Sequence, residues 1–432
     1  MAPTSLMLLL CASCGASVLF WCLVGLIRFS SEGWAGRLPP AGGLKLTVQD
    51  VAVVIAAHNE EVALPKCLAA LMRIIPTTNI YIASDGSRDR TVDIVRAAGC
   101  NVLDIQPNGG KALALDRAIG HFDLCGRYAA VLILDADSEI DPRYFDYALP
   151  LMSDAGVAVV AGHVLSRWRN QRWPSRDLIY AAYRTRLYRI LQAVFQYGMS
   201  WRFINVSYIA PGFASLYRTS ALRRIEITAP GLVIEDFNMT FEVHHKGLGR
   251  VAYSPRCCCT SEDPFSLRDY CKQVHRWYLG FWQTLLRNGV WPSFFWVSLG
   301  LLLLELVGFS LFIVTLPVFL AAHIALDGAG PVFAPGDFSL HWASPVQTFI
   351  FFATVDYALT VIVAIVERRP ALLVYGPLFP ALRILDAALF LSAFVKSFTV
   401  RSDGRWSSPD RRRSIDPSQR AAPISAPKGQ VA

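Results

Sequence analysis

The chain has 432 residues, of which 53% are hydrophobic and only 17% are charged, and its formal net charge is +8. A soluble protein usually has fewer apolar and more charged residues, so the composition argues against a wholly soluble chain. No basic run interleaved with aromatics predicts nucleic-acid binding, and many basic residues instead flank apolar runs, which indicates contact with membrane lipids.

The first feature in chain order is an apolar run without charges. It extends over about 23 residues, from Ser5 to Ile27, which is long enough to cross a bilayer as a helix. No Lys or Arg precedes the run, whereas Arg28, Arg37 and Lys45 follow it. We therefore expect residues 1–28 to be an uncleaved transmembrane anchor that leaves the next domain in the cytoplasm.

Residues 39–292 have the pattern of an α/β domain. Short apolar runs that predict strands alternate with segments of helical spacing, which favours an open, mostly parallel, Rossmann-like sheet. Ligands of such sheets bind beyond the carboxyl ends of the strands, where the polar clusters of this sequence fall. The predicted strands are Val51–Ala57, Ile80–Ala83, Asn101–Ile105 and Ala129–Leu134, and the predicted helices are Val62–Ile75, Thr91–Ala98 and Lys111–Ile119.

Residues 293–398 are predicted to form a membrane domain with two to three transmembrane or re-entrant helices. The connector at 323–344 lacks Lys and Arg, as expected of an external loop, whereas Glu367-Arg368-Arg369 suits an internal one. The apolar segments are 293–322, 346–366 and 371–398.

The basic tail at 399–432, which we expect to be disordered, conflicts with four full spans. Four spans from an external N-terminus would leave it outside, against the positive-inside rule. Arg383 and Asp386 interrupt the last apolar run, and Pro377 and Pro380 break its helix. We therefore expect the last segment to be re-entrant or interfacial and the tail to be cytoplasmic.

Two acidic motifs indicate where chemistry takes place. Asp135-Ala136-Asp137 follows a buried strand, and one or two carboxylates together with substrate phosphates are the usual ligands of Mg²⁺ or Mn²⁺ in nucleotide enzymes. Glu235 and Asp236 are adjacent acids in an apolar stretch, and Asp236 is our candidate general base. Taken alone, the first motif could be an ordinary loop and the second an acid pair at a helix N-terminus.

Further polar residues suit a nucleotide ligand. Asp85 ends a predicted strand before a glycine turn, where its carboxylate can accept hydrogen bonds from a uracil or a ribose. Lys111 follows Asn108-Gly109-Gly110 at a helix start and suits a phosphate. Gln273, Arg276 and Trp277 precede the membrane segments; Arg276 can neutralise a diphosphate and Trp277 can stack on a sugar, unless they form an interfacial belt.

In this order the motifs resemble family 2 glycosyltransferases with a GT-A fold, and in particular the processive membrane synthases of cellulose, hyaluronan and poly-N-acetylglucosamine. The resemblance covers Val51 to Trp282 and departs from the family pattern at Ile234, where Thr is usual. It implies uridine binding by Asn59, Glu60 and Asp85, further contacts to the sugar-nucleotide donor by Lys111, Asp135, Gln273, Arg276 and Trp277, a metal on Asp137 with Asp135, and catalysis by Asp236 with Glu235.

The implied activity is inverting transfer from a UDP-sugar to a growing β-linked polysaccharide. It would take place at the cytoplasmic face of the plasma membrane, in a multi-pass protein, with or without translocation of the product. Two alternatives stay open: transfer of a single sugar to a polyprenyl phosphate or lipid, and a non-catalytic transport or scaffold protein. Cys257, Cys258 and Cys259 fit no zinc or disulfide pattern, and we expect reduced thiols.

Overall fold

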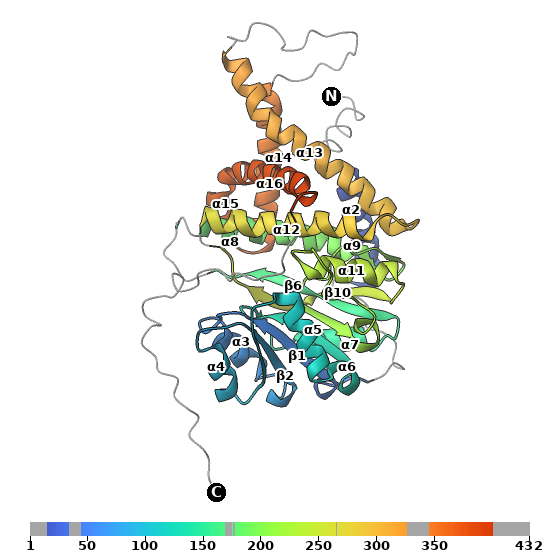
Figure 1. Cartoon of the computed structure of the whole chain (residues 1–432). Helices are drawn as coiled ribbons and strands as arrows, with labels where there is room; N and C mark the ends of the chain where they lie inside the picture. The colour runs from blue at the N-terminus through green and yellow to red at the C-terminus, as the bar shows by residue number, and fades with distance from the viewer. Residues whose placement is uncertain are drawn as a thin grey trace.

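The computed structural model describes residues 15–33, 45–168, 175, 178–264, 266–325 and 345–400. The start of the predicted anchor, most of the external connector and the basic tail lie outside these residues. The sheet domain is at one end of the molecule and α13 (Phe294–Ala325) and α14 (Pro345–Val366) extend from the other, with α12 (Leu267–Asn288) between them (Figure 1).

An eight-stranded mixed sheet forms the core of the domain, in the order β3-β2-β1-β4-β9-β6-β10-β5. β1, β2, β3 and β4 are mutually parallel, β9 is antiparallel to both β4 and β6, and β5 is an antiparallel edge strand on β10. The strands are β1 (Val51–Ala57), β2 (Ile80–Asp85), β3 (Asn101–Ile105), β4 (Ala130–Asp135), β5 (Glu139–Ile140), β6 (Val157–Ser166), β9 (Ala214–Arg218) and β10 (Arg250–Ser261). A separate two-stranded hairpin pairs β7 (Ser200–Trp201) with β8 (Ile204–Asn205).

Helices cover both faces of the sheet because the central strands are apolar on both sides. Alternate residues of β1 enter different cores: Val53 packs with α3 and α7, whereas Val54 packs with α5 and α11. The helices of the domain are α3 (Leu64–Leu71), α4 (Thr91–Ala97), α5 (Lys111–His121), α6 (Leu124–Arg127), α7 (Tyr144–Met152), α8 (Leu178–Ile190), α9 (Tyr197–Met199), α10 (Thr219–Leu222) and α11 (Glu235–His245).

The three consecutive cysteines lie on β10. Cys257 and Cys259 are buried in the core beneath α3 and α7, whereas Cys258 points to the other face of the strand. All three are free thiols, and burial raises the pKa of Cys258 to about 11. The alternation in burial along the run reflects the two-residue period of a strand.

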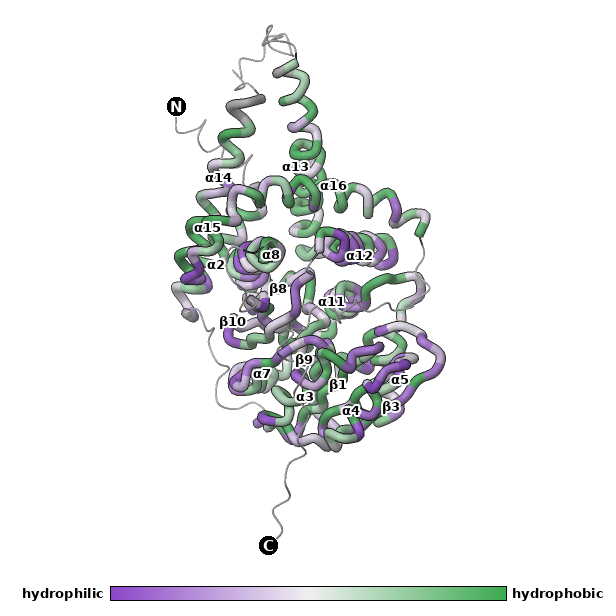
Figure 2. The backbone as a smooth tube through the Cα atoms, turned by 90° about the vertical axis from the view of Figure 1, so that its left-hand side faces the viewer, coloured by the Kyte–Doolittle hydropathy of each residue, from purple (hydrophilic) through white to green (hydrophobic). Residues whose placement is uncertain are grey.

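Three helical stretches of the described chain are long and apolar enough to cross a membrane: Phe294–Ala322, Phe349–Val366 and Ala371–Ser397. Both views show α13 and α14 leading away from the sheet domain, whereas α16 (Phe379–Ser397) lies across their direction and rests on α12 (Figures 1 and 2). A short η4 turn, Gly376–Leu378, separates α16 from α15 (Ala371–Tyr375).

The described part of the N-terminal segment is α2 (Ala16–Glu32), which continues beyond the predicted end of the anchor at residue 28. Arg28 is buried: it forms an ion pair with Glu32 at 3.5 Å and donates to Ser200 Oγ at 3.0 Å. Arg28, the first basic residue after the apolar run, therefore holds α2 against the sheet domain and does not contact lipid headgroups.

Candidate active site

The predicted polar residues meet at one edge of the sheet. Asn59 and Glu60 follow β1, Asp85 is the last residue of β2, and Asp135 is the last residue of β4. Since β2, β1 and β4 are parallel neighbours, their carboxyl ends lie side by side. Three motifs that are up to 76 residues apart, from Asn59 to Asp135, thereby surround one location.

The loop after β1 is tied to the loop after β2. Asn59 has a positive φ of 55°, its Oδ1 accepts from the backbone N–H of Arg88 at 2.8 Å, and its own N–H donates to Ser87 Oγ at 3.1 Å. The backbone N–H of Glu60 donates to Thr91 Oγ1 at 2.9 Å. These contacts give the two loops a fixed relative position, which a nucleoside-binding surface requires.

Asp85 holds the loop that carries Lys111. Its carboxylate oxygens accept hydrogen bonds from the backbone N–H groups of Gly109 at 2.8 Å and Gly110 at 2.7 Å. Gly86 has a φ of +67°, and a Cβ atom there would lie 2.8 Å from the backbone nitrogen of Asn108. The strand end and the loop are therefore in direct contact, and only glycine fits between them.

Lys111 is the centre of the site. Its Nζ lies 2.8 Å from Oδ1 of Asp135 and 2.8 Å from Oε1 of Glu235. Burial alone would lower the pKa of the ammonium group, but the two carboxylates outweigh it and raise the pKa above its ordinary value. One cation thus joins the acidic motif after β4 to the acidic motif at the start of α11.

The two acids of the second motif differ electrostatically. Burial raises the pKa of Glu235, but Lys111 and, more weakly, Arg276 outweigh it, so the pKa lies below its ordinary value. Burial and then the neighbouring Glu235 charge raise the pKa of Asp236 to about 6. The pKa values of the two neighbouring acids are therefore separated: Glu235 stays anionic, and Asp236 titrates near neutrality. Acid–base chemistry needs such a separation.

Asp236 is positioned by backbone groups. Its Oδ2 accepts from the N–H of Gly212 at 3.0 Å and its Oδ1 from the N–H of Phe237 at 2.7 Å. A Cβ atom on Gly212 would lie 3.2 Å from Lys111 Nζ and 3.4 Å from Glu235 Oε1. The sequence did not predict Gly212 as a site residue. Because it lacks a side chain, the backbone can approach both Lys111 and Glu235.

The carboxylates suit a divalent cation. Asp137 is half-buried two residues after Asp135, and the described residues contain no group of three or more His, Cys, Asp or Glu that could hold a metal by themselves. A site with one or two carboxylate oxygens fits Mg²⁺ or Mn²⁺, which take their remaining oxygen ligands from substrate phosphates and water. The donor set therefore fits the metal that the sequence predicts.

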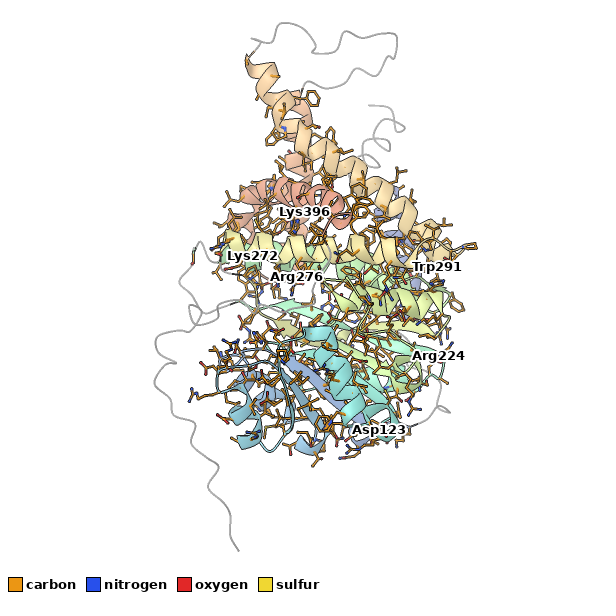
Figure 3. The ribbon with its side chains drawn as sticks, viewed as in Figure 1. Asp123, Arg224, Lys272, Arg276, Trp291 and Lys396 are labelled. Carbon is orange, nitrogen blue, oxygen red and sulfur yellow. The ribbon has the colours of Figure 1, made fainter. Side chains whose placement is uncertain are left out.

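The third motif lies on α12, above the sheet edge. Figure 3 shows Arg276 on the side of α12 that faces the sheet domain, in agreement with its effect on Glu235. Gln273 Oε1 accepts a hydrogen bond at 2.8 Å from Nη2 of Arg184, a residue of α8. The same guanidinium lies 4.5 Å from the ring centroid of Trp277.

Sequence reasoning missed Arg184. It is an arginine among alternating tyrosines and arginines, a pattern that is typical of a solvated helix face, and yet only 2% of its surface is exposed. Its neighbour Arg186 is also buried and forms an ion pair with Asp356 of α14 at 2.6 Å. α12 supplies the partners of Arg184 and α14 supplies that of Arg186, and these two helices explain why both arginines point inward.

Two acids, Glu305 of α13 and Asp356 of α14, lie within apolar helices, where a carboxylate can line a polar path or pair with another group. They do not face one another: Asp356 is bound by Arg186 and by Arg383, at 2.7 Å, whereas Glu305 accepts the backbone N–H of Ser17 at 3.0 Å. Both carboxylates therefore hold the membrane helices to the rest of the chain.

Comparison with known protein sequences gives a family and two relatives. A family model described as glycosyltransferase-like family 2 matches residues 49–280. Poly-beta-1,6-N-acetyl-D-glucosamine synthase of Staphylococcus epidermidis is 25% identical over 376 residues, which cover 84% of this chain and 88% of that protein. The enzyme of the same name from Staphylococcus aureus strain COL is 25% identical over 381 residues, with the same coverage.

Among solved structures, the mannosyltransferase PcManGT from Pyrobaculum calidifontis, in complex with GDP-Man and Mn²⁺, matches with a TM-score of 0.58. The match covers 91% of this chain and 97% of that one at 16% identity. At this identity the likeness concerns the fold alone.

Proposed function

Because the chain belongs to glycosyltransferase family 2, we propose that it transfers a sugar with inversion from a UDP-sugar to a growing β-linked polysaccharide. Family membership confirms the predicted resemblance and enzyme class, and the fold comparison confirms the predicted GT-A architecture. The observation that carries the proposal is the bridge from Asp135 through Lys111 to Glu235, which gathers three separate motifs beside Asp236.

The donor side of the site is formed by the strand ends. Asn59, Glu60 and Asp85 would hold the uridine, because their loops are fixed to one another and lie beyond the carboxyl ends of β1 and β2. Asp137, with Asp135, would hold Mg²⁺ or Mn²⁺, which neutralises charge on the departing diphosphate when bound. Arg276 supplies positive charge from α12, opposite the sheet.

The acceptor side is formed by α11 and α12. Asp236 would take the proton of the acceptor hydroxyl as its oxygen attacks the anomeric carbon, and attack from the side opposite the diphosphate inverts the configuration. Its raised pKa, about 6, makes it a stronger base than an ordinary aspartate while leaving it mostly ionised at neutral pH. Lys111 keeps Glu235 anionic beside it. The resemblance assigns Gln273 and Trp277 to the donor, but we assign them to the acceptor sugar, because both lie on α12 and an indole face can stack on a sugar ring.

The product class is inferred from the relatives. Both poly-beta-1,6-N-acetyl-D-glucosamine synthases match over 84% of this chain, which is more than the sheet domain. We therefore take N-acetylglucosamine as the first sugar to test. Transfer of one sugar to a polyprenyl phosphate or another lipid is the second candidate, because α12 and α16 bring the site next to the membrane helices.

The proposed topology has the sheet domain on the cytoplasmic side of the plasma membrane. If the N-terminal segment, α13 and α14 each cross once and α16 lies at the interface, the chain after α16 returns to the side of the sheet domain. This arrangement agrees with the positive-inside rule for the basic tail, whose structure lies outside the described residues. The crosswise direction of α16 supports it.

The test is UDP release and product sizing by purified protein in nanodiscs. UDP-N-acetylglucosamine, UDP-glucose and UDP-glucuronate are supplied separately with Mn²⁺, with and without a polyprenyl phosphate. Long product from one donor without added lipid supports the polysaccharide synthase and identifies its sugar. A single transferred sugar that requires the lipid would move the assignment to a lipid glycosyltransferase, and no UDP release under any condition would contradict both.

A further inference from the structure

The buried arginine of α8 contacts two residues of the α12 motif. Arg184 Nη2 donates to Gln273 Oε1 at 2.8 Å, and the guanidinium carbon lies 4.5 Å from the centre of the Trp277 ring. Gln273 and Trp277 are four residues apart on α12, so one planar group on α8 fixes two neighbouring side chains of the same helix face.

The geometry shows that the guanidinium is directed at α12 more than at a counter-ion. The carboxylate paired with Arg184 is Asp263, and the distance from its Oδ1 to Nη1 is 3.9 Å. The Tyr188 hydroxyl, one turn along α8, accepts from the same nitrogen at 3.0 Å. A charge that is 2% exposed needs compensation, and here much of it comes from an amide oxygen, a hydroxyl and aromatic rings.

We propose that Arg184 is a positioning residue for acceptor binding, which holds Gln273 and Trp277 in the orientation that receives the acceptor saccharide. The inference rests on the proposed function, since it takes these two residues as the acceptor contact. Trp277 is only half-buried although the guanidinium packs on it, so part of the indole is accessible to a sugar. Fixing both side chains before the acceptor arrives removes part of the entropy cost of binding it.

Arg184→Lys is the informative change, and Arg186→Lys is its matched control. Both arginines lie on α8 with side chains about equally buried, at 3% and 4% exposed. Arg186, however, donates to Asp356 and Thr360 of α14, and its guanidinium lies over the ring of Phe379 of α16. Lysine keeps the charge but lacks the planar fork that can bond an amide and stack on an indole at once.

The measurement is steady-state kinetics in nanodiscs with UDP-N-acetylglucosamine, Mn²⁺ and a short β-linked N-acetylglucosamine oligosaccharide as the acceptor. For Arg184→Lys we expect the acceptor KM to rise about tenfold, which corresponds to about 1.4 kcal/mol, and the products to shorten. The donor KM should be unchanged. Arg186→Lys should lower the melting temperature without changing the acceptor KM.

Several outcomes overturn the inference. An acceptor KM that changes equally in the two variants, or a donor KM that rises with the acceptor KM in Arg184→Lys, means that Arg184 is structural. If Arg184→Lys does not fold, Gln273→Leu replaces it, because it removes the oxygen that Arg184 binds; an unchanged acceptor KM then refutes the proposal. Absence of any transfer by the wild-type protein would contradict the proposed function itself, and this inference with it.

Discussion

The rate of sugar transfer should fall in acid with a midpoint set by Asp236. A base has to be deprotonated to act, and burial followed by the Glu235 charge raises the pKa of Asp236 to about 6. At pH 7 about 91% of such a group is ionised and at pH 5 about 9%, so kcat/KM should drop roughly tenfold between these values. An aspartate with the usual pKa near 3.9 would still be about 90% ionised at pH 5 and would show almost no loss.

The cause of this shift can be tested with Glu235→Gln. The substitution removes the negative charge that is the second contribution to the raised pKa, so the acid midpoint should move to lower pH. Asp154→Asn is the matched control, because Asp154 lies near the amino end of β6, at the opposite edge of the sheet, where it forms an ion pair with Arg250.

The assay is initial-rate UDP release with limiting donor and saturating Mn²⁺, from pH 5 to pH 8, for the wild type and both variants. We expect a midpoint near pH 6 in the wild type and in Asp154→Asn, and a lower midpoint in Glu235→Gln. A flat profile down to pH 5, or a midpoint that Glu235→Gln leaves in place, would refute the assignment of Asp236 as the titrating base.

Further predictions concern the cation, the turn and the metal. Lys111→Met leaves the Glu235 carboxylate, which is 8% exposed, without its cation and should lower the free energy of unfolding by about 2–3 kcal/mol. The loss is less than for a fully buried pair because Lys111 is 22% exposed. Thermal unfolding in detergent measures the loss, and Lys111→Arg should lose less. Gly86→Ala, with its Cβ against the Asn108 backbone, should lower the melting temperature and weaken UDP binding, and an unaltered affinity in calorimetry would count against the turn's role. EDTA should abolish transfer and Mn²⁺ restore it, whereas Asp137→Ala should stay inactive at any Mn²⁺ concentration.

The first half of the fold could be predicted because its strands are short, continuous apolar runs. β1 and β3 have the predicted bounds, and β2 extends two residues further, to include Asp85. The helix predicted over Val62–Ile75 is limited to Leu64–Leu71, since its apolar spacing continues into turns at both ends. β6, β9 and β10 were not predicted. Polar residues divide the short run of β9, and Pro255 and Arg256 interrupt β10, where its register against β6 shifts between Tyr253 and Cys258.

The candidate site residues could be predicted from motif order, but their contacts could not. The sequence placed Lys111 against a phosphate, whereas its ammonium lies between the carboxylates of Asp135 and Glu235, which are 100 residues apart in the sequence. Arg184 could not be recognised, because its burial depends on α12 packing above α8. Such contacts depend on how elements distant in the sequence meet, which local patterns do not specify.

The most direct test of the central claim compares UDP binding and sugar transfer in the wild type and Asp236→Asn. Asparagine has almost the same shape as aspartate. Its one oxygen can still accept from Gly212, although the hydrogen bond from Phe237 is lost, so the site should stay assembled while the base is removed. We predict an unchanged Kd for UDP with Mn²⁺ and a loss of transfer of at least about 100-fold. A variant that binds UDP and transfers sugar at the wild-type rate would contradict the account.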